Sequence, residues 1–224
     1  MKYKIRYFLM ILGVCSLCGC FDIVEEINLA ADGSGQMIVT LNLSQSRSKV
    51  ASVLLLDSVN GYKIPKPAEI RNHLEQLASR LGKMPGISQV NYTSDFTNYI
   101  ANIRFSFASV TSLNQISQVI FKELKIPHTD ATSYKFDAGA HIFSRNYAHM
   151  AQASASFNKL KAKDQALFKG AAYTSIYRFS VPVVSVSNKQ AKISPSKKAV
   201  MLRTELLDLI QGNATINNRI QLAN

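Results

Sequence analysis

The side chain for which the sequence predicts chemistry is the thiol of Cys20. Cys20 closes the run Ser16-Leu17-Cys18-Gly19-Cys20, directly behind an apolar stretch of about eleven residues, 7–17. Lys2, Lys4 and Arg6 precede that stretch, and this order of a basic start and a short apolar core is typical of a secretory signal. The stretch is too short to span a bilayer, which requires roughly 20 apolar residues. We therefore expect residues 1–19 to be a signal segment.

The sequence Leu17-Cys18-Gly19-Cys20 resembles the lipobox of bacterial lipoproteins. In that motif a leucine, two small residues and a cysteine direct the addition of a diacylglyceryl group to the cysteine, followed by cleavage just before it. The resemblance implies that Cys20 carries acyl chains such as palmitate and attaches the protein to a membrane of the cell envelope. Two or three acyl chains make such an anchor stable. The alternative is an ordinary signal peptide whose cysteines have no role.

The three cysteines, Cys15, Cys18 and Cys20, all lie in this first part of the chain, and none occurs in the 204 residues that follow. A secreted domain stabilised by disulfides would carry cysteines in its body, so this one must rely on its hydrophobic core. A chain of this length is sufficient, because a domain near 200 residues buries roughly 70% of the surface that its unfolded chain exposes. We expect residues 20–224 to form a single envelope domain.

The chain is strongly basic, with 26 lysines and arginines against 14 acidic residues. Removal of residues 1–19 would leave 23 basic and 14 acidic residues, a net charge of +9. A basic surface attracts anionic partners, which for an exported protein are membrane head groups or anionic envelope polymers. The sequence contains no nucleic-acid-binding motif, so we expect no nucleic acid partner. The alternative is that the lysines only keep the surface soluble.

Alternating apolar residues predict strands over 23–29 and 36–43, joined at Ala31-Asp32-Gly33-Ser34-Gly35. Asp-Gly followed by a second glycine is a strong hairpin signal. The periodicity further predicts helices over 46–59 and 69–81, a hairpin of strands 87–94 and 99–107, and a third helix capped by Thr111 or Ser112 and running to Leu124. A strand over 134–143 follows.

The segment 146–172 is basic and rich in alanine and serine, and it contains Lys159, Lys161, Lys163 and Lys169. It is either a basic amphipathic helix that lies on a membrane or partner, or a mobile insertion or surface helix. Beyond it we expect strands over 173–181 and 183–186 with an edge position or bulge at Pro182, short strands over 191–194, 199–203 and 216–222, and a helix over 205–210. The pattern predicts an α+β fold, an antiparallel sheet built from hairpins with two or three packed helices.

The lipobox and the Asp32-Gly33-Ser34-Gly35 turn, in this order of elements, resemble uncharacterised bacterial lipoproteins of the LppM-like kind. The resemblance implies an envelope location and an α+β domain. It implies no activity and no functional residue beyond Cys20.

Candidate catalytic residues give no coherent site. Ser34 between two glycines is not the G-x-S-x-G elbow of hydrolases and is interpreted as part of the turn. Glu25 and Glu26 point to opposite faces of a strand, and we interpret them as a solvated strand start. The four histidines have neither metal-ligand spacing nor cysteine partners, so we expect no metal and no cofactor.

Two functions follow from these observations. The first is a lipid-anchored, non-catalytic binding or assembly protein of the cell envelope, held in a membrane through Cys20. Its basic residues, above all Lys159, Lys161, Lys163 and Lys169, contact an anionic envelope surface or a protein partner. The alternative is an envelope hydrolase whose active site is assembled from distant residues.

Overall fold

The computed structural model describes residues 21–59, 61–123 and 132–224. The predicted signal segment 1–19 and the predicted lipidation site Cys20 lie outside these residues. Within the described part, none of the helices is both long and apolar enough to cross a membrane.

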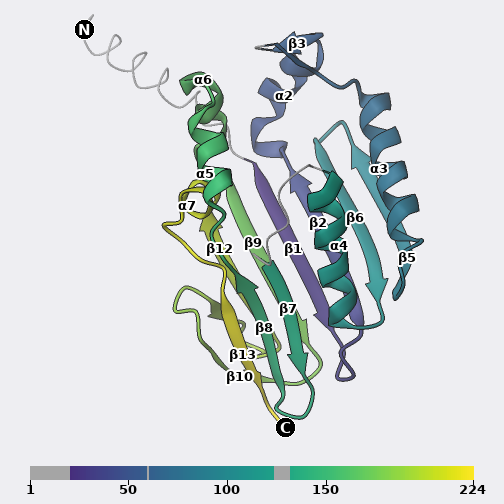
Figure 1. Ribbon diagram of the computed structural model, residues 1–224, viewed down its shortest axis with the longest axis vertical. Helices are drawn as coiled ribbons and strands as arrows, with labels where there is room; N and C mark the ends of the chain where they lie inside the picture. Colours follow the sequence, from purple (N-terminus) through teal and green to yellow (C-terminus); the bar gives the residue numbers. More distant parts are fainter. Residues whose placement is uncertain (1–20, 60, 124–131) are drawn as a thin grey trace, which may run out of the picture.

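The fold is α+β, as the sequence predicts, and it contains two main sheets (Figure 1). The larger sheet has the order β11-β12-β9-β1-β2-β6-β5. Its strands are β1 (Asp22–Leu29), β2 (Gly35–Asn42), β5 (Ile87–Asp95), β6 (Ile100–Phe107), β9 (Ala172–Phe179), β11 (Lys192–Ile193) and β12 (Ala199–Glu205). The smaller sheet has the order β10-β13-β8-β7, formed by β7 (Thr132–Asp137), β8 (Ile142–Tyr147), β10 (Val183–Val186) and β13 (Asn218–Leu222). A short pair, β3 (Ser58–Val59) and β4 (Tyr62–Lys63), lies apart from both.

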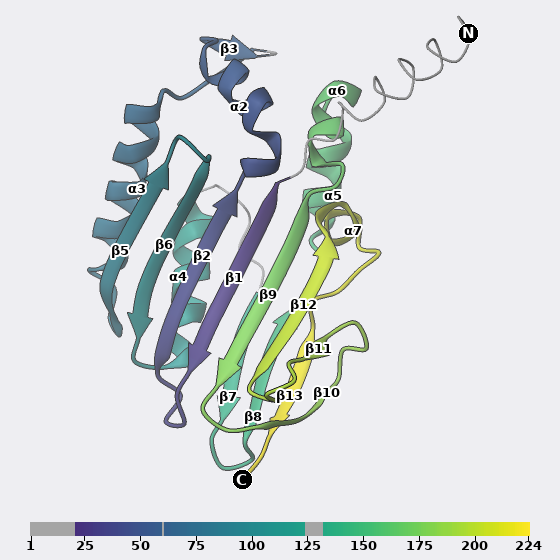
Figure 2. The same cartoon turned by 180° about the vertical axis from the view of Figure 1, so that it is seen from behind.

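One face of the larger sheet is covered by other elements. Helices α3 (Pro67–Leu81) and α4 (Val110–Glu123) and the smaller sheet all lie on this face, whereas Figure 2 shows the opposite face unobstructed. The main core fills the space between these layers and includes Ile27, Phe105, Phe143, Tyr177 and Ile220. The open face bears the ion pairs Arg178–Glu26 and Arg203–Asp22. This division follows from the alternation of the strands, which sends successive side chains to opposite faces.

The hairpin predicted at Asp32-Gly33-Ser34-Gly35 is confirmed. Gly33 has φ +84°, a conformation that glycine adopts without steric cost. The Asp32 carboxylate accepts hydrogen bonds from the backbone N–H and the hydroxyl of Ser34, at 3.0 and 2.7 Å. Ser34 is therefore a turn residue, as predicted.

Three predicted elements differ from those observed. Residues 134–143 are not one strand but the end of β7, a turn and the start of β8; the Asp137 carboxylate accepts from the backbone N–H of Ala140 and so closes the turn. The first helix, α2 (Arg47–Leu54), ends early, because the chain turns into β3. Helix α4 begins at Val110, so Thr111 and Ser112 lie within its first turn rather than capping it.

The sheet is also not wholly antiparallel. Strand β9 pairs parallel to β1 over its full length, with Asp22 opposite Ala172 and Leu29 opposite Phe179. This pair places strands from distant parts of the sequence side by side in one sheet. Pro182 follows β9 where the chain crosses to β10, an edge strand with the predicted irregularity between Val183 and Ser185.

The basic segment after β8 is helical. It forms α5 (Ala151–Asn158), α6 (Ala162–Gln165) and a 3₁₀ turn, η2 (Ala166–Phe168). A further short helix, α7 (Leu206–Gln211), follows β12 and packs against α5. A 3₁₀ turn, η1 (Ser44–Ser46), precedes α2.

Candidate functional site

The start of β1 is tied to the basic segment by aromatic contacts. The ring of Phe21 lies 5.9 Å from that of Phe168, edge to face, and Phe168 in turn lies 5.4 Å from the buried ring of Phe157. The backbone N–H of Ala172 donates to the Phe21 carbonyl at 3.0 Å. Helices α5 and α6 therefore lie beside the first described residue of the chain, at one end of the larger sheet (Figure 1).

The four predicted contact lysines share this end. Lys159 and Lys161 flank the link between α5 and α6, Lys163 lies in α6, and Lys169 follows η2; all four are exposed. Residues 159–169, called the lysine segment below, contain one acidic residue, Asp164, against these four lysines, a net charge of +3. Gln165 fixes the link by donating to the carbonyls of Phe157 and Leu160 at 3.2 and 3.1 Å. The structure thus brings the four lysines together and next to residue 21.

A second polar feature is buried between the two sheets. Glu25 is only 6% exposed, and its carboxylate accepts hydrogen bonds from the hydroxyls of Tyr173 and Tyr177 at 2.6 and 2.9 Å. The guanidinium of Arg145, in β8, lies 3.5 Å from the same carboxylate and 4.2 Å from the centre of the Tyr134 ring. The interpretation of Glu25 as part of a solvated strand start is therefore wrong, whereas Glu26 does lie on the open face.

Burial governs the ionisation of this cluster. It raises the pKa of Tyr134, Tyr173 and Tyr177 well above the ordinary value, and the charge of Glu25 raises each further. Burial by itself would lower the pKa of Arg145, but the neighbouring Tyr134 and Glu25 more than compensate, and the net shift is upward. The cluster is accordingly an ion pair held by neutral tyrosines across the sheet interface.

A signal for this cluster was present in the sequence. Glu25 has the same strand parity as Ile27 and Leu29, so it must share their buried face. Its partners, however, lie on strands more than a hundred residues away, and nothing in the local pattern identifies them.

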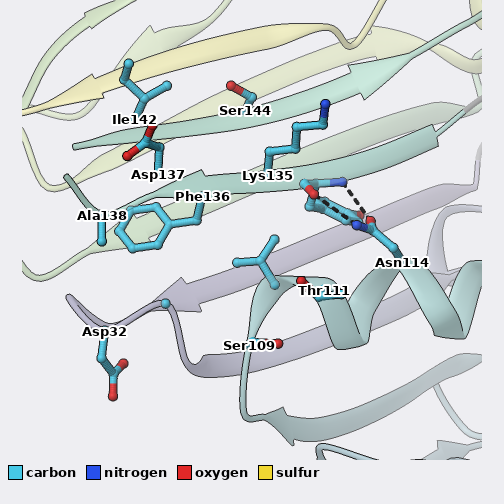
Figure 3. Close-up of a pocket in the computed structure, with 13 residues that line it drawn as sticks. Asp32, Ser109, Thr111, Asn114, Lys135, Phe136, Asp137, Ala138, Ile142 and Ser144 are labelled. Atoms are coloured by element: carbon cyan, nitrogen blue, oxygen red, sulfur yellow. Dashed lines mark hydrogen bonds between the residues drawn. The ribbon is translucent and has the colours of Figure 1, made fainter. Parts of the chain in front are cut away.

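A groove of about 830 Å³ lies at the end of the molecule opposite the lysine segment. It is formed by the β1–β2 turn, the start of α4 and the β7–β8 hairpin (Figure 3). Asn114 spans its inner wall, accepting from the backbone N–H of Tyr134 at 2.8 Å and donating to the Tyr134 carbonyl at 3.0 Å. The acidic residues of the groove, Asp32 and Asp137, lie on opposite sides of it in Figure 3. Each carboxylate is bound within its own turn, and hydrogen bonds from Ser34 lower the pKa of Asp32.

The histidines that the structure describes are dispersed. His73 is in α3, His141 is in the β7–β8 turn, and His149 hydrogen-bonds through Nε2 to the Ile210 carbonyl at 2.9 Å. His128 lies outside the described residues. Within residues 21–59, 61–123 and 132–224, no three histidine, cysteine or acidic side chains form a cluster that could hold a metal ion.

Neither models of known protein families nor curated proteins match this chain. Among solved structures, it is weakly similar to the NMR structure of the folded domain of the LppM protein of Mycobacterium tuberculosis. The TM-score is 0.44 at 12% sequence identity, covering 91% of this chain and 90% of that chain. A likeness of this size shows no family membership.

Proposed function

We propose that this protein is a lipid-anchored protein of the bacterial cell envelope with a non-catalytic binding or assembly role. In this proposal the acyl chains on Cys20 hold it in a membrane, and the lysine segment binds the anionic head groups of that membrane. The observation that carries the proposal is the position of the lysine segment beside Phe21, the residue that directly follows Cys20.

The geometry supports a membrane surface as the anionic partner. Consecutive Cα atoms are about 3.8 Å apart, so a lipidated Cys20 would hold Phe21 at the level of the head groups. Phe168 contacts Phe21, and Lys169 follows Phe168 in the chain. Electrostatic attraction decays over about 8 Å at physiological ionic strength, so it acts on lysines that lie close to such a surface. A lysine near an anionic membrane contributes roughly 1 kcal/mol.

The head-group contact is tested without the anchor. Both core clusters draw their members from residues between Ile27 and Leu222, so a chain of residues 21–224 retains them. We expect this chain to co-sediment with phosphatidylglycerol vesicles, to bind phosphatidylcholine vesicles much more weakly, and to be released by added salt. Replacement of all four lysines of the lysine segment by glutamine should remove most of this binding.

A matched control changes the same charge elsewhere. Lys189, Lys192, Lys197 and Lys198 are also exposed, and they lie in β11 and its flanking loops, away from Phe21. Their replacement by glutamine should leave most of the vesicle binding intact. Equal losses in the two quadruple variants would show that only net charge matters and would refute a localised contact. Binding to peptidoglycan but not to either vesicle would point instead to an envelope polymer.

The anchor is tested with the full chain in a bacterial host that lipidates exported proteins. We expect a high-salt wash, which removes head-group binding, to release the Cys20→Ser protein from the membrane fraction and to leave the Cys18→Ser protein there. Mass spectrometry of the membrane-bound protein should find the acyl chains on residue 20. An unmodified protein in the soluble fraction would refute the anchor.

A further inference from the structure

The most exposed large apolar side chain among the described residues is Leu55, at 83%, and its neighbour Leu56 is 48% exposed. These two residues, called the leucine tip below, follow the last residue of α2. Their backbone N–H groups donate to the carbonyls of Ser52 and Val53, at 3.3 and 3.0 Å, so the turn that presents them is closed by hydrogen bonds. Two adjacent leucines held outward in a defined turn cost free energy in water, because each could bury apolar surface elsewhere.

The leucine tip lies at the end of the molecule where β1 begins. Helix α2, β3, α6 and the start of β1 all lie at this end in both ribbon views, opposite the C-terminus (Figures 1 and 2). Two other exposed leucines share it: Leu41 near the end of β2, paired with Ile23, and Leu167 beside Phe168. All the exposed leucines of the described residues thus lie at the end where β1 begins, whereas Val184, Ile193 and Met201 are exposed elsewhere.

The leucine tip lies in a part of the chain that has more basic than acidic side chains. Residues 47–69 contain four basic and two acidic residues, a net charge of +2. The ammonium of Lys66 lies 3.1 Å from the Leu56 carbonyl, to which it donates, and 3.1 Å from the Asp57 carboxylate. A lipid bilayer suits both kinds of side chain. Its hydrocarbon accepts apolar side chains, and its anionic head groups bind lysines.

The inner face of α2 holds this arrangement in position. Val50 and Leu54 are half-buried and line a largely apolar cavity of about 170 Å³ with Ile70 and Phe96. The helix thus packs inward with these residues and presents Leu55 and Leu56 outward. The inner face of α2 therefore stabilises the fold, while Leu55 and Leu56 stay exposed for contact.

We propose that the leucine tip inserts into the hydrocarbon of the membrane that carries the anchor, while basic residues of the segment 47–69 bind head groups. This inference rests on the proposed function and extends it. The acyl chains at residue 20 and the leucine tip would form two attachments at different points of one end of the domain. Two attachments fix the orientation of the domain on the membrane, whereas the acyl chains alone leave it free to pivot.

The test uses the absence of tryptophan from the sequence. A single tryptophan introduced into the full chain is an unambiguous fluorescent probe. Leu55→Trp probes the leucine tip, Leu167→Trp probes the lysine segment, and Val184→Trp, 62% exposed in β10 near the opposite end, is the control. Each lipidated protein is reconstituted in phosphatidylglycerol–phosphatidylcholine vesicles with or without bromine on the acyl chains, which quenches tryptophan on contact.

We expect brominated acyl chains to quench most of the fluorescence at position 55, with a blue shift of its emission, and to leave position 184 unquenched. Quenching at 167 without quenching at 55 would overturn the leucine tip and leave the proposed function standing. Quenching at neither 55 nor 167 would overturn the leucine tip, whereas the proposed function would still be decided by the salt-sensitive vesicle binding described above. Equal quenching at all three positions would also overturn the inference, because it would mean that the domain has no preferred orientation.

Discussion

Replacement of Glu25 by glutamine should destabilise the fold far more than any other change of one carboxylate on β1. Glutamine has nearly the size of glutamate, so the substitution removes a charge without opening a cavity. It leaves the Arg145 guanidinium, 6% exposed, without the carboxylate 3.5 Å away, and it presents an amide to two tyrosine hydroxyls that both donate to Glu25. A buried charge that loses its partner must be solvated by the protein alone, and the interior does this poorly.

The expected magnitude follows from the burial of the pair. Removal of one partner from a buried ion pair costs about 3–5 kcal/mol of unfolding free energy. For a domain of this size each kcal/mol lowers the melting temperature by about 2–4 °C, so the melting temperature should fall by roughly 6–20 °C. Circular dichroism during thermal and urea unfolding of residues 21–224 measures both quantities.

Glu26 offers a matched control on the adjacent residue. It pairs with Arg178 on the open face, where the Arg178 side chain is 46% exposed. Exposed pairs contribute about 0–1 kcal/mol, so Glu26→Gln should change the unfolding free energy little. Equal effects of Glu25→Gln and Glu26→Gln would refute the reasoning, because they would show that the buried carboxylate is no more important than the solvated one.

A double variant separates the pair from its surroundings. Arg145→Met fills a similar volume without charge, and combined with Glu25→Gln it leaves no unpaired ion in the sheet interface. We expect the double variant to be markedly more stable than the sum of the two single effects implies, with a coupling of about 1–3 kcal/mol. Strictly additive effects would mean that the two side chains do not interact.

Three further predictions concern the packing of the strands and the ionisation of the buried tyrosines. Asn114→Ala removes both hydrogen bonds to the backbone of the strand β7 and should lower the unfolding free energy by about 1–3 kcal/mol in urea unfolding; an unchanged midpoint would show that solvent replaces the amide. Gly35→Ala should cost at least about 1–3 kcal/mol by overpacking, because its Cβ would meet the Asn28 carbonyl oxygen, whereas Gly139→Ala, with its nearest contact at 3.6 Å, should cost little; similar melting temperatures would contradict this. Stability should fall as pH rises above about 10, because the unfolded chain then releases tyrosine protons that Tyr173 and Tyr177 retain in the folded state through their raised pKa. Ultraviolet titration should find the buried tyrosines ionising only as the protein unfolds, and their ionisation in the folded state would contradict the prediction.

Local elements could be predicted from sequence because their causes are local. The β1–β2 hairpin follows from a turn in which Gly33 alone adopts positive φ and Asp32 binds Ser34. Helix α3 follows from apolar residues at helical spacing and a proline at its start. The β7–β8 turn was missed because it carries a weaker signal, since its strained position is taken by His141 rather than by a glycine.

The sequence by itself determined the basic character of the chain, the four clustered lysines, the lack of cysteines beyond residue 20 and the α+β class. Each is a matter of composition or of neighbours in the chain. Only the tertiary structure decided that β9 lies parallel to β1, that Glu25 meets Arg145, and that the leucine tip shares one end with the lysine segment. These contacts join residues up to about 150 positions apart, and they are selected by which layers can pack together and satisfy the polar groups between them, a property of the whole chain.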